Sequence, residues 1–223
     1  MGAITAVTDL AAAGDVAVLT VNSPPVNALS QQVRDGIVKG MQQAIGNAAV
    51  KAIVLICDGR TFIAGADITE FGKPPQPPSL IEVIATLDEV KKPTIAAVHG
   101  TPLGGGLELT MGCHFRVAAA GTRLGLPEIK LGLIPGAGGT QRLPRLVGIE
   151  KALPMILSGD PIPAKDALGA GLVDEIVEGD LVAGALKFAR GVLAAKRPLQ
   201  RVKDRDDKLE EIRANPAKFD EIV

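Results

Sequence analysis

The chain has 223 residues, which is enough for one sizeable domain with a hydrophobic core. Hydrophobic residues make up 47% of it, charged residues 22%, and the formal net charge is -1, as in an ordinary globular protein. This balance, with an aromatic content of 2% and no Trp or Tyr, excludes a basic or base-stacking surface for nucleic acid.

The composition also bears on the compartment. No uninterrupted apolar run reaches the ~18 residues that a membrane span requires, and the amino terminus lacks the basic residues of a signal peptide. Cys57 and Cys113 lie in apolar runs, as small core residues of a reducing compartment do. With two histidines and no cysteine ligand pattern, no metal site is expected. We therefore predict a cytoplasmic protein without a membrane segment.

The first elements along the chain read as strand, helix, strand. Residues 16–21 (VAVLTV) and 52–57 (AIVLIC) are apolar runs of strand length, and the second is expected to be covered on both faces. Between them Ser30 can cap a helix over residues 31–45. The apolar stripe of that helix is expected to comprise Val33, Ile37, Met41 and Ile45.

A glycine-bearing loop, DGRTFIAGADITEF, follows directly after the second strand, at residues 58–71. Loops beyond the ends of parallel strands commonly line a ligand crevice, although a plain surface turn is the alternative here. The prolines of residues 74–78 predict a mobile connection. Ser79 and Glu82 then form a capping box for a helix reaching about residue 90.

The stretch TIAAVHGTPLGGGLELTMGC, residues 94–113, predicts a strand, a glycine turn and a helix start at residues 107–111. Three glycines, Gly104 to Gly106, place backbone N–H groups at the positive end of a helix, where a negative oxygen is stabilised. Glu108, one turn inside, suggests a general acid or base beside that oxyanion. For the glycines alone, a tightly packed connection is the alternative reading. Neither the GxxxxGK[ST] nor the GxGxxG nucleotide pattern fits.

The second half continues with a strand at residues 115–119 and with Glu128 shortly before a third glycine loop at residues 136–139. Helices are expected at residues 140–146, 151–157 and 164–168, a strand at 172–177, and a helix from the cap Asp180 to about residue 195. From Lys196 onward basic and acidic residues mix. We therefore place a domain at residues 1–195 and a charged helical tail, or a linker to a further module, at 196–223.

Several of these segments together resemble the crotonase, or enoyl-CoA hydratase/isomerase, superfamily. The matching segments are NSPPVNAL, FIAGADITEF, GTPLGGGLELTMGC, LGLPEIKLGLIPGAGGTQRLPRLVG and SGDPIPAKDALGAGLVDEIV, in the family's order and spacing over about residues 16–177. GLELTMGCHFRVA is most similar to the amino-terminal hydratase module of peroxisomal-type multifunctional β-oxidation enzymes. The resemblance implies an α/β fold, a crotonase-like spiral of ββα units with a helical carboxy-terminal part.

The resemblance implies an enoyl-CoA hydratase that adds water syn across the 2,3 double bond of trans-2-enoyl-CoA in fatty-acid β-oxidation. By motif, the backbone N–H groups of Ala66 and Gly105 match the family's oxyanion hole. Glu108 and Glu128 match its catalytic glutamates, of which Glu108 helps to activate a water and Glu128 protonates Cα. A retained Glu128 also implies a possible 3,2-enoyl-CoA isomerase activity.

Coenzyme A enters only as part of the substrate, and no redox cofactor or metal is implied. The residues that match the family's substrate-binding positions are Val26, Ala28, Leu29, Ala64, Gly65, Asp67 and Ile68, with Gly136 helping to place the water. Thr69 stands where many relatives carry a lysine for the CoA phosphates. Lys73, Lys91 or Lys92 could replace it, although a solvated surface lysine is the commoner explanation of each.

Two alternatives stay open. One is a crotonase-fold scaffold, or an isolated module that binds acyl-CoA with little catalysis, against which the intact Glu108 and Glu128 speak. The other is an isomerase or thioester hydrolase, which product analysis distinguishes from a hydratase. For partners, the resemblance implies an acyl-CoA substrate and either a homo-oligomer or fusion to a hydroxyacyl-CoA dehydrogenase module.

Overall fold

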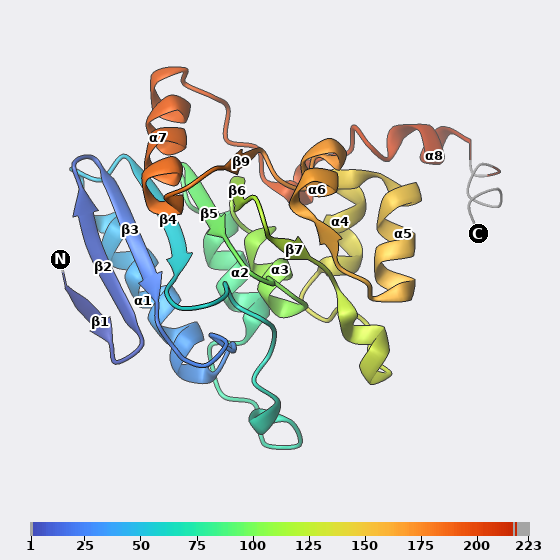
Figure 1. Cartoon of the computed structure of the whole chain (residues 1–223), viewed down its shortest axis with the longest axis horizontal. Helices are drawn as coiled ribbons and strands as arrows, with labels where there is room; N and C mark the ends of the chain where they lie inside the picture. Colours follow the sequence, from blue (N-terminus) through green and yellow to red (C-terminus); the bar gives the residue numbers. More distant parts are fainter. Residues whose placement is uncertain (1, 216, 218–223) are drawn as a thin grey trace.

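A computed structural model describes residues 2–215 and 217 of the chain (Figure 1). Its centre is one sheet in the strand order β1-β2-β3-β4-β5-β6-β9, in which β1 to β3 pair antiparallel and β3 onward pair parallel. Its strands are β1 (Ala3–Thr5), β2 (Thr8–Ala13), β3 (Val16–Val21), β4 (Ala52–Cys57), β5 (Thr94–Val98), β6 (Phe115–Ala119) and β9 (Glu175–Val177). A separate pair joins β7 (Arg123–Leu124) to β8 (Ile162–Pro163).

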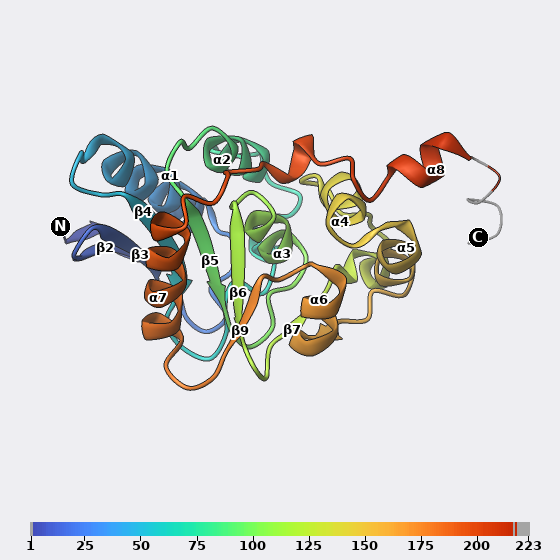
Figure 2. The ribbon, with the colours of Figure 1, turned by 90° about the horizontal axis from the view of Figure 1, so that it is seen from above.

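Helices cover both faces of this sheet, as the view from above shows (Figure 2). One face carries α7 (Leu181–Ala194), and the other carries α1 (Gln31–Gly46), α2 (Leu80–Asp88) and α3 (Gly105–Thr110). The remaining helices are α4 (Gly139–Val147), α5 (Ile149–Ser158), α6 (Ala164–Ala170) and α8 (Glu210–Ala214). None of the described helices is long and apolar enough to cross a membrane.

The alternation of side chains along β4 explains why its six residues are all buried. Val54 and Ile56 join the core cluster beneath α7, with Phe188 of that helix. Leu55 and Cys57 join the larger cluster beneath α1 and α2 on the opposite face. Because both faces of the strand are covered, the strand is a continuous apolar run, as the sequence predicts.

The capping predictions are confirmed. The side chain of Ser30 accepts a hydrogen bond from the Val33 N–H at the start of α1, and Asp180 caps α7 in the same way. Ser79 and Glu82 form both hydrogen bonds of a capping box at the start of α2. Each of these three helices therefore begins where a nearby side chain satisfies one of its first free N–H groups.

Three sequence predictions are wrong in detail. Ile45 of α1 is 38% exposed, and Ala44 is buried in its place, because steps of four residues drift by about 40° each around a helix. Helix α3 begins at Gly105 rather than at residue 107, so the glycines form its first turn. The last strand, β9, is Glu175–Val177 only.

Two further regions contain structure that the sequence did not predict. The hairpin of β1 and β2 was not predicted, since its alanine-rich strands carry little β-propensity and no Asn-Gly or Asp-Gly turn. Beyond Lys196, Val202 and Leu209 are buried, and the 3₁₀ turn Val202–Asp204 packs on α4. The boundary at Lys196 stays a prediction, and residues 216 and 218–223 of the predicted tail lie outside the described residues.

Candidate active site

Two loops meet at the start of α3 and bring two backbone amides together. A Cβ on Gly106 would lie 1.9 Å from the Ile63 carbonyl oxygen, so only glycine lets these loops approach so closely. A Cβ on Gly105 would lie 3.9 Å from the Ala66 nitrogen. Within residues 2–215 and 217, neither the Ala66 nor the Gly105 N–H donates a hydrogen bond to the protein. The pair of amides predicted as an oxyanion hole is thus adjacent and free to donate.

The segment predicted to bind CoA runs beside the Ala66 loop. The Leu29 N–H donates to the Gly65 carbonyl at 2.9 Å, and Leu29 pairs with Ala66 as an isolated parallel bridge. The Ala64 N–H donates to the Val26 carbonyl at 3.2 Å. A cavity of about 400 Å³ lies here, lined by Leu29, Arg34, Ala66, Asp67, Glu70, Phe71, Lys73, Pro74, Pro75, Gln76 and Ser79. The two predicted substrate segments are therefore neighbours in the structure.

The outer end of the Ala66 loop is a short 3₁₀ turn, Ile68–Glu70. Asp67 caps it by accepting a hydrogen bond from the Thr69 N–H at 2.9 Å, which lowers the pKa of the Asp67 carboxyl. The side chain of Ile68 is 72% exposed. Asp67 thus both lines the cavity and caps the turn that follows the Ala66 loop.

Glu108 is buried within α3, and its carboxylate is fixed by backbone donors. Its Oε1 accepts hydrogen bonds from the N–H groups of Ala137 at 2.8 Å and Gly139 at 2.7 Å. Burial raises the pKa of Glu108, while these two hydrogen bonds and the charge of Arg142 act in the opposite direction. Gly136 directly precedes these donors, so the third glycine loop lies against Glu108 as well.

Glu128 lies on the 3₁₀ turn Pro127–Leu131, with its carboxyl beside Gly104 at the start of α3. Its Oε1 lies 3.0 Å from the position of a Cβ on Gly104. Its Oε2 is buried and, among the described residues, has no hydrogen-bond partner. Burial raises the pKa of Glu128, and the nearby charge of Glu108 raises it further. The two carboxyls therefore interact with each other beside one glycine turn.

Replacing Glu128 by glutamine should stabilise the fold at neutral pH. Because the folded-state pKa is raised, the ionised carboxyl opposes folding at pH values above that pKa, and this cost disappears below the unfolded pKa of about 4.3. We expect Glu128→Gln to raise the free energy of unfolding by about 0.5–2 kcal/mol at pH 7, with the gain lost near pH 4. Urea unfolding at both pH values measures it, and an equal gain at both would contradict the account.

The sequence did not identify Arg34, a buried residue of α1 that ties three segments to the cavity. Its guanidinium donates to the carbonyls of Leu29 at 2.5 Å, Gln76 at 3.1 Å and Pro78 at 2.6 Å. It also pairs with the carboxylate of Glu70 at 2.9 Å. The proline segment predicted as a mobile connection is thus hydrogen-bonded to the helix that carries Arg34, and only the folded chain reveals these partners.

Removing the guanidinium should destabilise the fold strongly. Arg34→Met leaves the buried Leu29 carbonyl, the carbonyls of Gln76 and Pro78 and Glu70 Oε2 without the guanidinium donor, which we expect to lower the free energy of unfolding by about 2–3 kcal/mol. Arg190→Met is the matched control, because Arg190 is exposed and, among the described residues, its guanidinium donates only to the Ala13 carbonyl. It should change stability by less than about 0.5 kcal/mol. Chemical denaturation of both variants tests this, and equal effects would contradict it.

The three lysines considered for CoA phosphates lie in different settings. Lys73 lines the cavity beside Ala66, and Lys91 is exposed. The ammonium of Lys92 bonds the carbonyls of Ala44, Ile45 and Asn47 at the end of α1, at 2.8–3.0 Å. Lys92 is therefore a helix-terminus residue, and Lys73 is the lysine of the three placed at the cavity.

The chain matches known proteins throughout most of its length. The family model for enoyl-CoA hydratase/isomerase matches residues 11–219. A peroxisomal bifunctional enzyme of Danio rerio is 45% identical over 184 residues, 82% of this chain and 25% of that protein. A probable enoyl-CoA hydratase of Bacillus subtilis is 49% identical over 165 residues, 71% of this chain and 64% of that protein. The chain thus spans a quarter and just under two thirds of these relatives.

Solved structures give the same picture. A structure described as an enoyl-CoA hydratase subunit from Geobacillus kaustophilus superposes with a TM-score of 0.79 at 34% identity, covering 97% of this chain and 86% of that one. A second, an enoyl-CoA hydratase from Bacillus anthracis, gives 0.77 at 30% identity over 96% and 87%. These matches confirm the resemblance that the sequence motifs indicated and the predicted α/β fold class.

Proposed function

The chain belongs to the enoyl-CoA hydratase/isomerase family, and from that membership we propose that it hydrates trans-2-enoyl-CoA thioesters. The observation that carries this proposal is the pair of carboxyls, buried Glu108 and half-buried Glu128, near two backbone amides that donate to no other described residue. Hydration of a conjugated thioester needs such groups. Its carbonyl oxygen gains negative charge and needs hydrogen-bond donors, while the attacking water loses a proton and Cα gains one.

In the proposed reaction, the thioester carbonyl oxygen accepts hydrogen bonds from the N–H groups of Ala66 and Gly105. As the water oxygen bonds to Cβ, electron density moves through Cα to that carbonyl oxygen, which becomes enolate-like. The two amides stabilise this charge, and each donor of such a hole contributes roughly 2.7–4 kcal/mol to transition-state stabilisation. Because both are backbone groups, their position depends on the glycine contacts rather than on side chains.

The two glutamates divide the proton transfers. Glu108 accepts a proton from the attacking water, and its own orientation is fixed by the amides of Ala137 and Gly139. Glu128 delivers a proton to Cα, a role that suits a carboxyl whose pKa is raised. The water oxygen ends on Cβ and one proton on Cα, so the reaction is redox-neutral, and a proton must return from Glu108 to Glu128 before the next cycle.

The same arrangement supports a secondary isomerase activity. Moving a double bond from the 3- to the 2-position removes a proton at C2 and adds one at C4, again through an enolate-like thioester. Glu128, whose Oε2 has no partner among the described residues, could serve both transfers. Incubation with a 3-enoyl-CoA tests this, since the proposal predicts a 2-enoyl or 3-hydroxy product that Glu128→Gln does not form.

The metabolic context is also a proposal. Relatives from Cucumis sativus and Arabidopsis thaliana carry names of fatty-acid beta-oxidation multifunctional proteins, and this chain spans 29% and 28% of them. We assign the chain to β-oxidation on that basis, with a dehydrogenase acting on its 3-hydroxyacyl-CoA product. A homo-oligomer or a fusion to such a module, and a cytoplasmic location, stay predictions.

A further inference from the structure

A groove runs from the catalytic loop along one face of α2 and one face of α4. It encloses about 380 Å³, and its α2 wall is formed by Ile81, Ile84, Ala85 and Asp88, which share one helical face. The opposite wall comprises Ala137, Gly138, Gln141, Arg142 and Arg145, with Lys203 added from the carboxy-terminal segment. The groove is thus apolar along part of α2 and charged at its far end.

The near end of this groove touches the catalytic residues. Ala137, which lines it, donates the hydrogen bond at 2.8 Å that fixes Glu108. At the start of α2, Leu80 Cδ2 lies 2.9 Å from the position of a Cβ on Gly105. An acyl chain whose carbonyl lies at the amides of Ala66 and Gly105 can therefore continue from Cβ into this groove.

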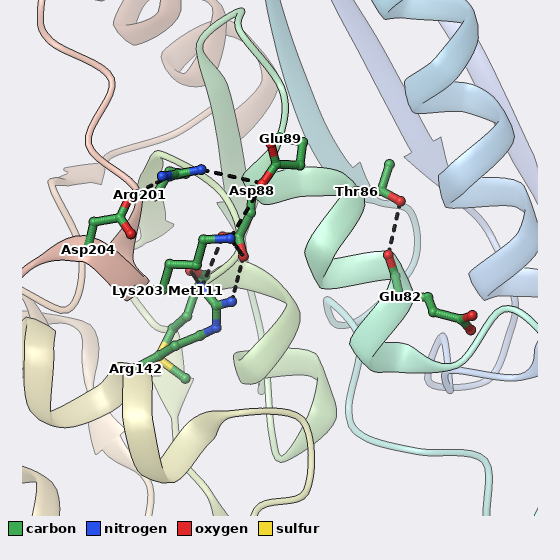
Figure 3. Close-up of polar contacts among 9 residues, drawn as sticks. All are labelled: Glu82, Thr86, Asp88, Glu89, Met111, Arg142, Arg201, Lys203 and Asp204. Carbon is green, nitrogen blue, oxygen red and sulfur yellow. Dashed lines mark hydrogen bonds and ion pairs between the residues drawn. The ribbon is translucent and has the colours of Figure 1, made fainter.

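At the far end lies an ion cluster that joins three segments (Figure 3). The buried carboxylate of Asp88, at the end of α2, accepts hydrogen bonds from Arg142 Nη1 at 3.0 Å and Nη2 at 2.7 Å. Lys203 Nζ lies 3.3 Å from the same carboxylate. Arg142 also reaches the Met111 carbonyl, behind α3. Charged groups of α2, α4 and the segment after α7 thus meet at this point.

We propose that the cluster of Asp88, Arg142 and Lys203 is the end wall of the acyl pocket and limits the enzyme to short- and medium-chain 2-enoyl-CoA. From Ile81 to Asp88 the helix rises roughly 10 Å, which sets the length of the apolar groove. A longer chain would press its apolar terminus against the cluster and displace the water that solvates its exposed side, at a cost in binding. This inference rests on the proposed placement of the thioester carbonyl.

Variants that widen or narrow the groove, at positions other than Glu108 and Glu128, test the proposal. Lys203→Ala removes the outer member of the cluster and leaves the Arg142–Asp88 pair intact. We expect the ratio of kcat/KM for 2-dodecenoyl-CoA to kcat/KM for crotonyl-CoA to rise roughly fourfold for each additional methylene buried. Ala85→Leu narrows the groove midway and should lower the same ratio. Lys208→Ala, an exposed lysine of the same segment, is the matched control and should leave it unchanged.

Binding of saturated acyl-CoAs separates this proposal from the proposed function, because it needs no turnover. Calorimetry with butyryl-CoA and lauroyl-CoA measures this binding. Lys203→Ala should lower the dissociation constant of lauroyl-CoA relative to that of butyryl-CoA, and Ala85→Leu should raise it. If the two variants change the dissociation constants in this way but the wild type hydrates no thioester, the end-wall proposal is supported and the hydratase proposal is contradicted. If hydration occurs but both variants keep the wild-type ratios, the end wall is overturned.

Discussion

Replacing Glu108 by glutamine is expected to lower the rate of crotonyl-CoA hydration by about 10²–10⁴-fold. Glutamine can still accept a hydrogen bond from Ala137 or Gly139, so the loop that surrounds Glu108 should keep its place. It cannot accept the proton of water, and the attack on Cβ loses its base. Loss of the enoyl-thioester absorbance measures the rate.

The control for this variant is Glu150→Gln, an exposed carboxyl in the first turn of α5. It should retain the wild-type rate. Glu128→Gln should lose a comparable factor, and the double variant should lose little more than either single one, because the two residues act as a unit. A Glu108→Gln protein that is folded, binds substrate and hydrates within about threefold of the wild type would refute the role of Glu108.

Gly105→Ala is expected to reduce hydration by about 10²–10³-fold while leaving the fold largely intact. The added Cβ would lie 2.9 Å from Leu80 Cδ2 and 3.0 Å from Leu29 Cδ1, which are the far ends of flexible side chains and can shift. It would also lie 3.9 Å from the Ala66 nitrogen, beside the position proposed for the thioester carbonyl oxygen. The loss should therefore appear in kcat and not in the unfolding midpoint.

Two other glycines serve as controls for this experiment. Gly191→Ala, on α7, meets nothing within 4 Å of its Cβ and should change neither activity nor fold adversely. Gly106→Ala would place its Cβ 1.9 Å from the Ile63 carbonyl oxygen, a backbone atom that cannot move alone, so this variant should lose stability. If Gly105→Ala retained full activity, the backbone amide of Gly105 would not be part of an oxyanion hole.

Elements with strong local signals could be predicted from the sequence. Strand β4 is a continuous apolar run, and α2 begins with a capping box, so each is indicated by the residue types within one short stretch of sequence. The hairpin of β1 and β2 has no such signal, because it is held by pairing with β3 and its own residues are mostly alanine, threonine and aspartate. Its existence depends on tertiary contacts that periodicity does not encode.

The residues of the candidate site also differ in how far the sequence alone could predict them. The glycines of residues 104–106 and Glu108 signal an anion site locally, whereas the pairing of Glu108 with Glu128 was implied only by the family resemblance. Arg34 looks like an ordinary helix arginine in the sequence, yet its partners Gln76 and Pro78 are over 40 residues away. The donors to Glu108 are 29 and 31 residues away. Such long-range partners become visible only once the loops are placed.

The measurement that tests the central claim most directly is the change in enoyl-thioester absorbance when the purified protein meets crotonyl-CoA, with the product identified by mass. We expect the absorbance to fall and a product heavier by one water to accumulate, at a rate proportional to protein concentration. A folded protein that binds the thioester with no loss of absorbance, or that releases free coenzyme A instead, would contradict the proposed hydratase.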